Sequence, residues 1–298
     1  MTTAVDAAPI EAGRWRSFFR RRPVLMRLLR HKAFVIGFTL FGLVVLAAVF
    51  ADLITTADPA RISIRNRFKP PSLEHPLGTD NLGRSQLARI VHGARLSLAI
   101  GFAVVVLNGV FGVLLGAAAG YFRRFDNILM RATDALMAFP AVLLAIAIAA
   151  ALGASSLTAA IALSVVYIPR TARIVRASVL VVRELEFVQA AKAMGASHVR
   201  ILSKHILPNC MAPLIVQLTF IFAYAVLSEA VLSFLGLGAA PPTPTWGNII
   251  AEGRQYMREA AWITLVPGLA LAITVVGLNL LGDGLRDVLD PRLKVMQD

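Results

Sequence analysis

The chain has 298 residues, of which 57% are hydrophobic and only 16% are charged. Soluble domains average about 25% charged residues, so this composition excludes the soluble enzyme folds. The single cysteine, Cys210, excludes an intrachain disulfide and a cysteine-rich metal site, and we expect no metal site. The formal net charge of +13 indicates membrane orientation and contact with anionic lipid, and we expect no nucleic acid partner.

Five stretches without a charged residue are long enough to cross a membrane, since a spanning helix needs about 18 residues. They cover residues 33–51, 96–122, 135–169, 205–228 and 260–282. The third would form a helix of about 52 Å, against a hydrocarbon core of about 30 Å, so it must fold back. The expected turn is 153–156, Gly-Ala-Ser-Ser. The sequence therefore predicts an all-α integral membrane protein with six transmembrane helices.

Basic residues indicate how the predicted spans are oriented. The segments on the same side as the N-terminal tail hold 21 of the 30 Lys and Arg, against nine on the opposite side. The positive-inside rule therefore predicts that both termini are cytoplasmic. In chain order we expect a cytoplasmic N-terminal tail (1–32), a first transmembrane helix (33–54), an extracytoplasmic segment with an amphipathic helix (55–95), a five-helix core (96–282) that includes a cytoplasmic loop (170–208), and a cytoplasmic C-terminal tail (283–298).

The amphipathic helix is predicted from the end of the extracytoplasmic segment. Leu87, Ile90, Val91 and Ala94 follow the i, i+3, i+4, i+7 spacing of one helix face. Such a helix either contributes to a docking surface for a partner or lies on the membrane surface. The spacing fits both alternatives.

Three glycines form a stripe on the second predicted span. Gly112, Gly116 and Gly120 recur at every fourth position. Small residues at this spacing let two helix backbones approach closely inside a membrane. The stripe is therefore expected to pack against another helix, which belongs either to this chain or to a partner subunit.

Few polar side chains lie within the predicted spans. Glu229 is the one acidic residue of the fifth span, and a carboxylate at that depth must face protein or water. It either bonds to helix neighbours or lines a translocation pathway or its outer gate. Asn108 and Gln217 are further candidates for the pathway or for polar contacts between helices.

Three arginines follow the fourth predicted span at intervals of three. Arg170, Arg173 and Arg176 begin where the apolar run ends. A voltage sensor carries such charges across the membrane field, so this position does not fit one. We expect the three side chains to mark the cytoplasmic end of the span and to contact lipid phosphate.

Sequence motifs for catalysis are absent. The chain contains no G-x-x-x-x-G-K-[ST], no H-E-x-x-H and no G-x-S-x-G. His198 and His205 lie in a basic loop, where a solvated surface position is expected. We therefore predict no catalytic residues and no enzyme.

The predicted cytoplasmic loop 170–208 is too long for a simple connector. Residues 186–194 combine good helix formers, and Gly195 follows at the position where a positive φ costs nothing. Ser197 can cap a second helix. The two helices would form a rigid knob that either enters a groove on a partner or lies on lipid. The apolar face of the second helix is expected to consist of Val199, Leu202 and Ile206.

The same loop resembles a known signature. Gln189-Ala190-Ala191, Gly195 and Ile206-Leu207-Pro208 are similar to the E-A-A-x(3)-G…I-x-L-P signature of ATP-binding-cassette (ABC) importer permeases. Three other strings resemble the C-type subunit of the dipeptide/oligopeptide permease group: HPLGTDNLGRSQLARIVHG (75–93), EAVLSFLGLG (229–238) and NLLGDGLRDVLDPR (279–292). Gln189 departs from the signature's Glu, and Ser85 stands where the group usually has an acid.

The resemblance implies a type I ABC importer permease fold in the bacterial inner membrane. The implied partners are a second permease subunit, two ABC ATPases, an extracytoplasmic solute-binding protein and membrane lipid. ATP and Mg would be bound by the ATPases, so this chain would carry no cofactor. The alternative is a stand-alone secondary transporter or channel. The implied ATPase-coupling residues are Glu186, Gln189, Ala190, Ala191, Met194, Gly195 and Ala196.

Overall fold

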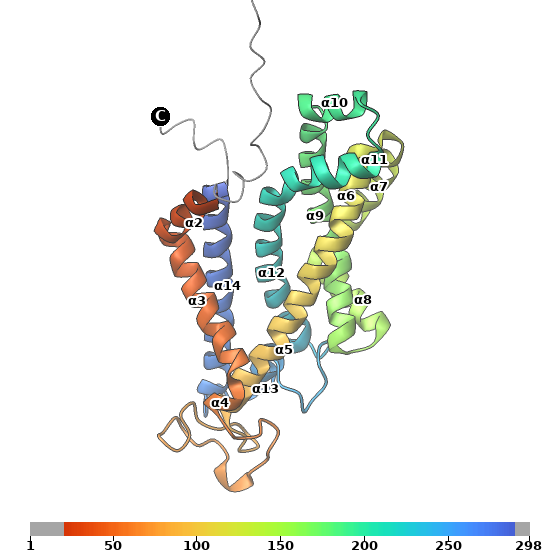
Figure 1. The fold of residues 1–298 in the computed structure, drawn as a ribbon. Coiled ribbons are helices and arrows are strands. Elements are labelled where there is room, and N and C mark those ends of the chain that lie inside the picture. The colour runs from red at the N-terminus through yellow and green to blue at the C-terminus, as the bar shows by residue number, and fades with distance from the viewer. Residues whose placement is uncertain (1–20, 290–298) are drawn as a thin grey trace, which may run out of the picture.

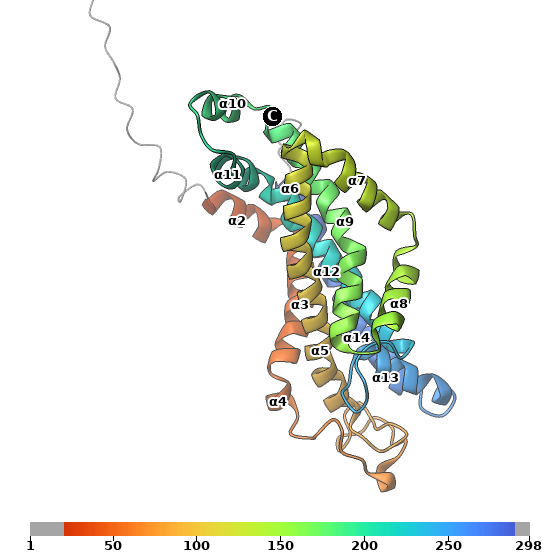
Figure 2. The ribbon, with the colours of Figure 1, turned by 90° about the vertical axis from the view of Figure 1, so that its right-hand side faces the viewer.

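The computed structural model describes residues 21–289, and every regular element in that range is a helix. Figures 1 and 2 show an elongated bundle with short helices and loops at both ends. The predicted all-α architecture is confirmed for these residues. The elements are α2 (Arg21–Arg30), α3 (Lys32–Val49), α4 (Ala51–Ile54), η1 (Ile64–Asn66), α5 (Gln86–Leu107), η2 (Asn108–Gly112), α6 (Val113–Tyr121), α7 (Arg123–Met137), α8 (Ala141–Leu152), α9 (Ser156–Val182), α10 (Glu186–Ala193), α11 (His198–Arg200), η3 (Ile201–Ile206), η4 (Leu207–Cys210), α12 (Met211–Phe234), α13 (Trp246–Gly253), η5 (Arg254–Tyr256) and α14 (Trp262–Leu289).

Four helical segments of the described range are long and apolar enough to cross a membrane. They are Lys32–Val49, Gln86–Tyr121, His198–Phe234 and Trp262–Leu289. A fifth is obtained if α7 and α8, which meet at an angle of 90°, count as one broken span. Helix α9 has 27 residues but carries three arginines. The predicted number of six spans is therefore not confirmed by length and composition.

The third predicted stretch reverses where the sequence indicated. Gly153 adopts a φ of +89°, and the Ser155 side chain caps α9 by accepting a hydrogen bond from the Thr158 amide. The predicted helix before this turn is nevertheless broken, because α7 ends at Met137 and Pro140 precedes α8. Proline disfavours a helical conformation in the residue before it. Helix α8 is only about 18 Å long, which is too short to span a membrane alone.

Helix α9 is longer than predicted, because it continues through Pro169 to Val182. Arg173 donates a 2.5 Å hydrogen bond to Asp134 of α7. Arg176 donates two hydrogen bonds, of 2.5 and 2.6 Å, to Asp126 of the same helix. The expected contact of these two arginines with lipid phosphate is therefore corrected, since both pair with carboxylates of α7.

Helix α12 is central, since it contacts α5, α9, α13 and α14. The glycine stripe lies opposite α9. A Cβ atom added at Gly116 would lie 2.5 Å from the Ala172 carbonyl oxygen, and one at Gly120 would lie 2.8 Å from the Val179 Cβ. One at Gly112 would come within 2.7 Å of Thr171. Of the two expected neighbours, the stripe thus packs against a helix of its own chain.

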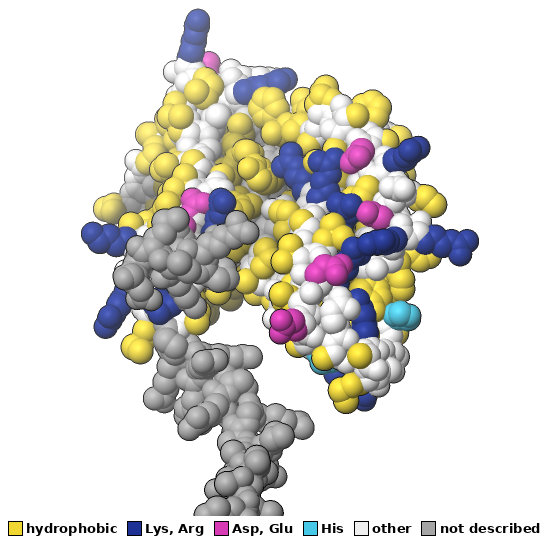
Figure 3. All heavy atoms as spheres, turned by 90° about the horizontal axis from the view of Figure 1, so that it is seen from above, with side chains coloured by type: hydrophobic (Ala, Val, Ile, Leu, Met, Phe, Trp, Pro, Cys, Tyr) yellow, Lys and Arg dark blue, Asp and Glu magenta, His cyan; other side chains and the backbone are white. Residues whose placement is uncertain are grey.

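The two ends of the bundle are formed by different elements. Helices α2, α10 and α11 and the last turns of α14 lie at one end, and α4, α13 and the segment 55–85 lie at the other (Figure 1). Seen from the α10 end, Lys and Arg side chains gather among hydrophobic ones (Figure 3). The C-terminal end of α14 and α2 thus share a side with α10. Most of the predicted N-terminal tail, and residues 290–298 of the C-terminal one, lie outside the described residues.

The predicted amphipathic helix forms the first turns of α5 and is continuous with the following span. Its face is buried against protein, since Ile90, Val91 and Ala94 are each at most 7% exposed. It is therefore not a separate helix on the membrane surface. Arg95, at the same end, donates hydrogen bonds to the carbonyl oxygens of Ala48 (2.6 Å) and Val49 (2.9 Å), which caps α3.

Candidate functional site

Helix α10 protrudes from the bundle on the continuation of α9 (Figure 1). Val188 is its one fully buried residue, at 0% exposure, and it packs with Val182, Ile201 and Ile206. The predicted coupling residues, which do not include Val188, are all exposed or half-buried. Exposed are Glu186, Gln189, Ala190, Met194 and Gly195, and half-buried are Ala191 and Ala196. The helix thus presents a small-residue surface that is anchored at one point.

The end of α10 follows the sequence prediction. Gly195 has a φ of +78° and donates a hydrogen bond of 2.9 Å to the Lys192 carbonyl. Nothing lies within 4 Å of a Cβ atom added there, so the backbone conformation and not a close neighbour favours glycine. The Ser197 side chain accepts a hydrogen bond from the Arg200 amide at the start of α11. The predicted helix, its glycine terminus and the second cap are confirmed.

The predicted apolar face of the second helix is wrong in one position. Val199 is 76% exposed, whereas Ile201 and Ile206 are at most 1% exposed. After one turn the helix continues as the π-helix η3, whose wider turn brings residues five apart to the same side. Leu202 is half-buried, so the buried face is centred on Ile201 and Ile206.

Side chains at the base of α10 brace it against its neighbours. The Gln189 amide donates a hydrogen bond of 2.9 Å to the Arg183 carbonyl. Arg183 in turn donates one of 2.7 Å to the Gly120 carbonyl at the end of α6. The Tyr121 hydroxyl lies 2.9 Å from Nδ1 of His198. His198 is exposed, as expected for a solvated surface position, and it also contacts Tyr121. These contacts between distant residues are not predictable from the local sequence pattern.

Glu229 is fully buried in α12, at 0% exposure. Its Oε1 accepts a hydrogen bond of 2.6 Å from the Ser233 hydroxyl one turn later, whereas Oε2 has no partner among residues 21–289. The carboxyl group faces protein, and Glu229 does not line the cavity that lies between α9, α12 and α14.

Asn108 and Gln217 occupy different surroundings. Asn108 is buried at the start of η2, donates a hydrogen bond of 2.9 Å to the Val104 carbonyl and accepts one of 3.4 Å from Thr171 of α9. It therefore joins two helices. Gln217 lines a cavity of about 770 Å³ between α9, α12 and α14. The structure does not bring Glu229, Asn108 and Gln217 together.

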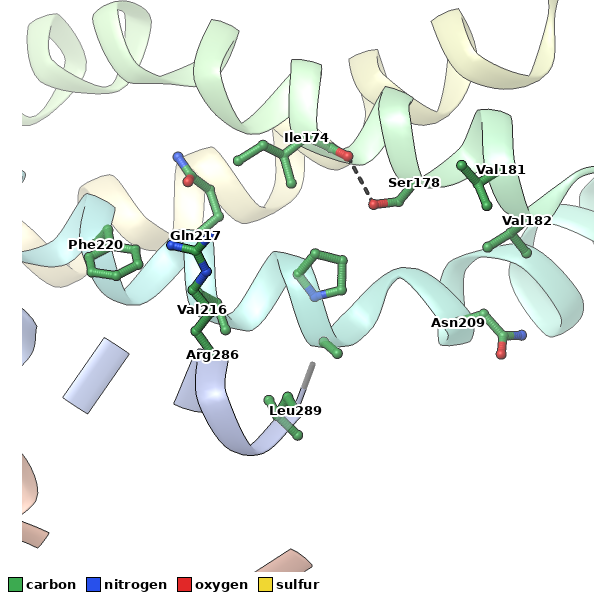
Figure 4. A pocket seen from close by; sticks show the side chains of 12 residues that line it. Ile174, Ser178, Val181, Val182, Asn209, Val216, Gln217, Phe220, Arg286 and Leu289 are labelled. Carbon is green, nitrogen blue, oxygen red and sulfur yellow. Dashed lines mark hydrogen bonds between the residues drawn. The ribbon is translucent and has the colours of Figure 1, made fainter. Parts of the chain in front are cut away.

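The cavity is lined mostly by apolar side chains. In Figure 4, Ile174 and Ser178 of α9 face Val216 and Gln217 of α12, and Arg286 comes from α14. Arg286 is the one charged residue among those that line it. The wall also includes Val181, Val182, Asn209, Ala212, Pro213, Phe220 and Leu289.

A buried ionic cluster occupies the opposite end of the bundle. Asp80 is 0% exposed, and its Oδ2 accepts hydrogen bonds from Arg84 (2.6 Å) and Arg89 (2.7 Å). Both arginines also bond to Glu252 of α13. The cluster therefore ties the segment before α5 and the first turn of α5 to α13. Nearby, the hydrogen bond from Arg95 holds the pKa of the exposed Asp52 carboxyl below its usual value.

Two family models match the chain. Residues 109–295 match the family described as binding-protein-dependent transport system inner membrane component. Residues 13–71 match the N-terminal transmembrane domain of oligopeptide transport permease C. Together the matches cover the first span and the helical core from residue 109 onward.

Similar proteins cover nearly the whole chain. A Brucella abortus protein described as a peptide transport system permease is 56% identical over 278 residues, which are 92% of this chain and 94% of that protein. The dipeptide transport system permease DppC of Alkalihalophilus pseudofirmus is 45% identical over 281 residues (94% and 90%). The glutathione transport system permease GsiD of Pectobacterium atrosepticum is 41% identical over 283 residues (94% and 92%).

A solved structure has a similar fold. A chain of the MetNI methionine ABC transporter, in an inward-facing conformation, superposes with a TM-score of 0.55 and 22% identity. The match covers 67% of this chain and 95% of that one. At this identity the likeness shows the fold alone. From the family matches and the relatives, the chain belongs to the binding-protein-dependent transport system inner membrane component family, as a peptide ABC transporter permease of the oligopeptide permease C type.

Proposed function

We propose that this chain forms half of the translocation pathway of an ATP-driven importer in a bacterial inner membrane. A second permease subunit supplies the other half, and the solutes are di- or oligopeptides or related small molecules. The relatives support this solute class, since they include proteins named as dipeptide and glutathione transport system permeases. In this arrangement the α10 end of the bundle and both termini are cytoplasmic.

The observation that carries the proposal is the exposed and braced helix α10. Glu186, Gln189, Ala190 and Met194 present a surface that fits the helix-in-groove mode of recognition. The occupied groove belongs to one of two ABC ATPases, which bind ATP and Mg. Energy therefore comes from other chains, in keeping with the missing phosphate-binding loop motif.

Movement of the ATPase reaches the bundle through the contacts at the base of α10. Val188 packs on Val182 at the end of α9, and the Gln189 hydrogen bond joins the same two helices. On the other side, η3 and η4 lead directly into α12. A rigid displacement of α10 therefore moves α9 and α12 together, and these two helices border the cavity of Figure 4.

The opposite end of the bundle faces the solute-binding protein. Segments 72–95 and 239–260 are the proposed docking surfaces, and the cluster of Asp80, Arg84, Arg89 and Glu252 joins them. Because buried ion pairs fix geometry, the two segments respond to docking as one unit.

Reconstitution in lipid vesicles tests the proposal. One set of vesicles contains this chain alone, and the other contains it with the second permease subunit, the ATPases and the binding protein. We expect uptake of a labelled dipeptide only in the second set and only with ATP. Uptake by the chain alone, driven by an ion gradient, would favour the stand-alone secondary transporter or channel.

A further inference from the structure

Arg170 is an arginine in the interior of a long helix. It is residue 15 of the 27 residues of α9, and it is half-buried. Arg173 and Arg176 on the next turns pair with carboxylates of α7. No carboxylate among residues 21–289 pairs with Arg170, and α9 continues beyond it to Val182. An arginine within an apolar helix that lacks a carboxylate partner is a candidate contact for an ion or a substrate.

Two tyrosine rings hold the guanidinium group in place. Its Cζ lies 5.6 Å from the ring centroid of Tyr167 and 5.6 Å from that of Tyr224. The two rings are stacked, with centroids 6.4 Å apart, and the Tyr167 hydroxyl is fixed by a 2.7 Å hydrogen bond to Ser228. Cation–π contacts use the faces of the rings and leave the N–H donors of the arginine available for a planar anion.

The position of Arg170 continues the cavity between α9 and α12. On α9, Ile174 and Ser178 line the cavity and follow Arg170 at intervals of four. On α12, Phe220 lines it and precedes Tyr224 by four residues. Residues four apart are neighbours on a helix surface, so Arg170 and Tyr224 lie one turn beyond the cavity wall.

The charges along this route have one sign. Arg286 lies in the cavity wall (Figure 4), Arg170 lies one turn beyond it, and none of the residues that line the cavity is acidic. Tyr224 is 45% exposed and Arg170 is half-buried, so one of the two rings beside the arginine lies at the surface of this subunit. The arrangement complements an anion and repels a free cation.

We propose that Arg170, bracketed by Tyr167 and Tyr224, is a transient binding site for a carboxylate group of the transported peptide. Guanidinium and carboxylate groups match in a planar, two-bonded geometry. The flanking aromatic faces tolerate different peptide side chains because they offer apolar area without a hydrogen-bond requirement. The proposal rests on the proposed function and assigns the solute contact within that pathway.

The test uses the complete transporter in lipid vesicles and two matched solutes, a dipeptide with a free C-terminal carboxylate and its C-terminal amide, both transported by the wild-type complex. Each uptake rate is divided by the wild-type rate for the same solute, so that any preference of the binding protein cancels. We expect Arg170→Gln to lower relative uptake of the carboxylate peptide by roughly tenfold and to leave the amide within about twofold. Arg173→Gln is the matched control and should affect both solutes equally.

The outcomes separate this proposal from the proposed function. An equal loss of both solutes in Arg170→Gln, or no loss of either, would overturn the binding site while ATP-driven transport stands. If the wild-type complex transports neither solute with ATP, the proposed function itself fails. Should Arg170→Gln not assemble, Tyr224→Leu provides the same comparison. We expect this variant to lower uptake of the carboxylate peptide alone, by less than Arg170→Gln would. An equal effect on both solutes would overturn the binding site.

Discussion

The Gln189 side chain donates a 2.9 Å hydrogen bond to the main-chain carbonyl of Arg183, so the first turn of α10 is tied back to the end of α9. The signature that this loop resembles has Glu at that position, and an ionised carboxylate cannot donate such a bond. Gln189, which replaces the Glu of the signature, thus holds the first turn of α10 against the end of α9. It also gives a direct way to loosen α10 without changing its length.

We expect Gln189→Glu to speed amide hydrogen exchange in residues 186–193 by roughly two- to tenfold, because one hydrogen bond contributes about 0.5–1.5 kcal/mol. Gln189→Ala should have the same effect, since it also removes the donor. Exchange rates are measured by mass spectrometry on the detergent-solubilised chain. Unchanged rates in both variants would show that the bond does not hold α10.

The glycine stripe should be sensitive to any side chain. In Gly116→Val, the new Cβ would lie within 2.5 Å of the Ala172 carbonyl oxygen, so α6 and α9 must separate. Overpacking of this kind costs about 1–3 kcal/mol, and we expect the midpoint of thermal unfolding in detergent to fall by several degrees. Gly42→Val is the matched control, because nothing lies within 4 Å of a Cβ atom there. Equal midpoints for the two variants would contradict the packing of α6 on α9.

The ionic cluster of Asp80, Arg84, Arg89 and Glu252 should depend on Asp80. Asp80→Asn leaves two buried arginines with Glu252 as their one remaining carboxylate in the cluster, and breaking a buried pair costs about 3–5 kcal/mol. We expect faster proteolysis within residues 55–85 and a lower unfolding midpoint. Asp58→Asn, in an exposed turn of the same segment, should leave both unchanged. Equal protease resistance of the two variants would mean that the cluster does not hold the segment.

The sequence was sufficient to predict what local patterns determine. Four of the five apolar stretches, the turn at 153–156 and the end of α10 at Gly195 depend on neighbours in the chain, and the structure contains them. The absence of charge in 135–169 does not predict the break before α8, although Pro140 signals it. The period of an α-helix misplaces the face of η3, because η3 is a π-helix.

Contacts between distant segments had no sequence signal. The Tyr121–His198 hydrogen bond joins residues 77 apart, and the Arg89–Glu252 pair joins residues 163 apart. The tyrosine bracket of Arg170 likewise requires α9 and α12 side by side. Such contacts depend on which helices lie side by side, and the pattern of a single sequence does not show this.

Two open glycines with positive φ allow a matched test of coupling. Gly195 (φ +78°) ends α10, and Gly153 (φ +89°) lies in the turn before α9 at the opposite end of the bundle. Neither has an atom within 4 Å of an added Cβ, so Asp imposes similar backbone strain at both. We expect Gly195→Asp to insert into the membrane but to lose ATP-driven uptake, and Gly153→Asp to retain it. Near-normal uptake by Gly195→Asp would contradict the coupling mechanism.

Cross-linking tests most directly whether α10 contacts an ATPase. Met194 is 87% exposed on the knob, and Leu157 is 68% exposed at the other end of α9. In the assembled transporter, with Cys210 replaced by Ser, we expect a disulfide-containing thiol-to-amine cross-linker to join Met194→Cys to a lysine of an ATPase subunit, with loss of uptake until the linker is reduced. Leu157→Cys should give no such product. Failure of Met194→Cys to cross-link to any ATPase, in a complex that still imports peptide with ATP, would contradict the central claim.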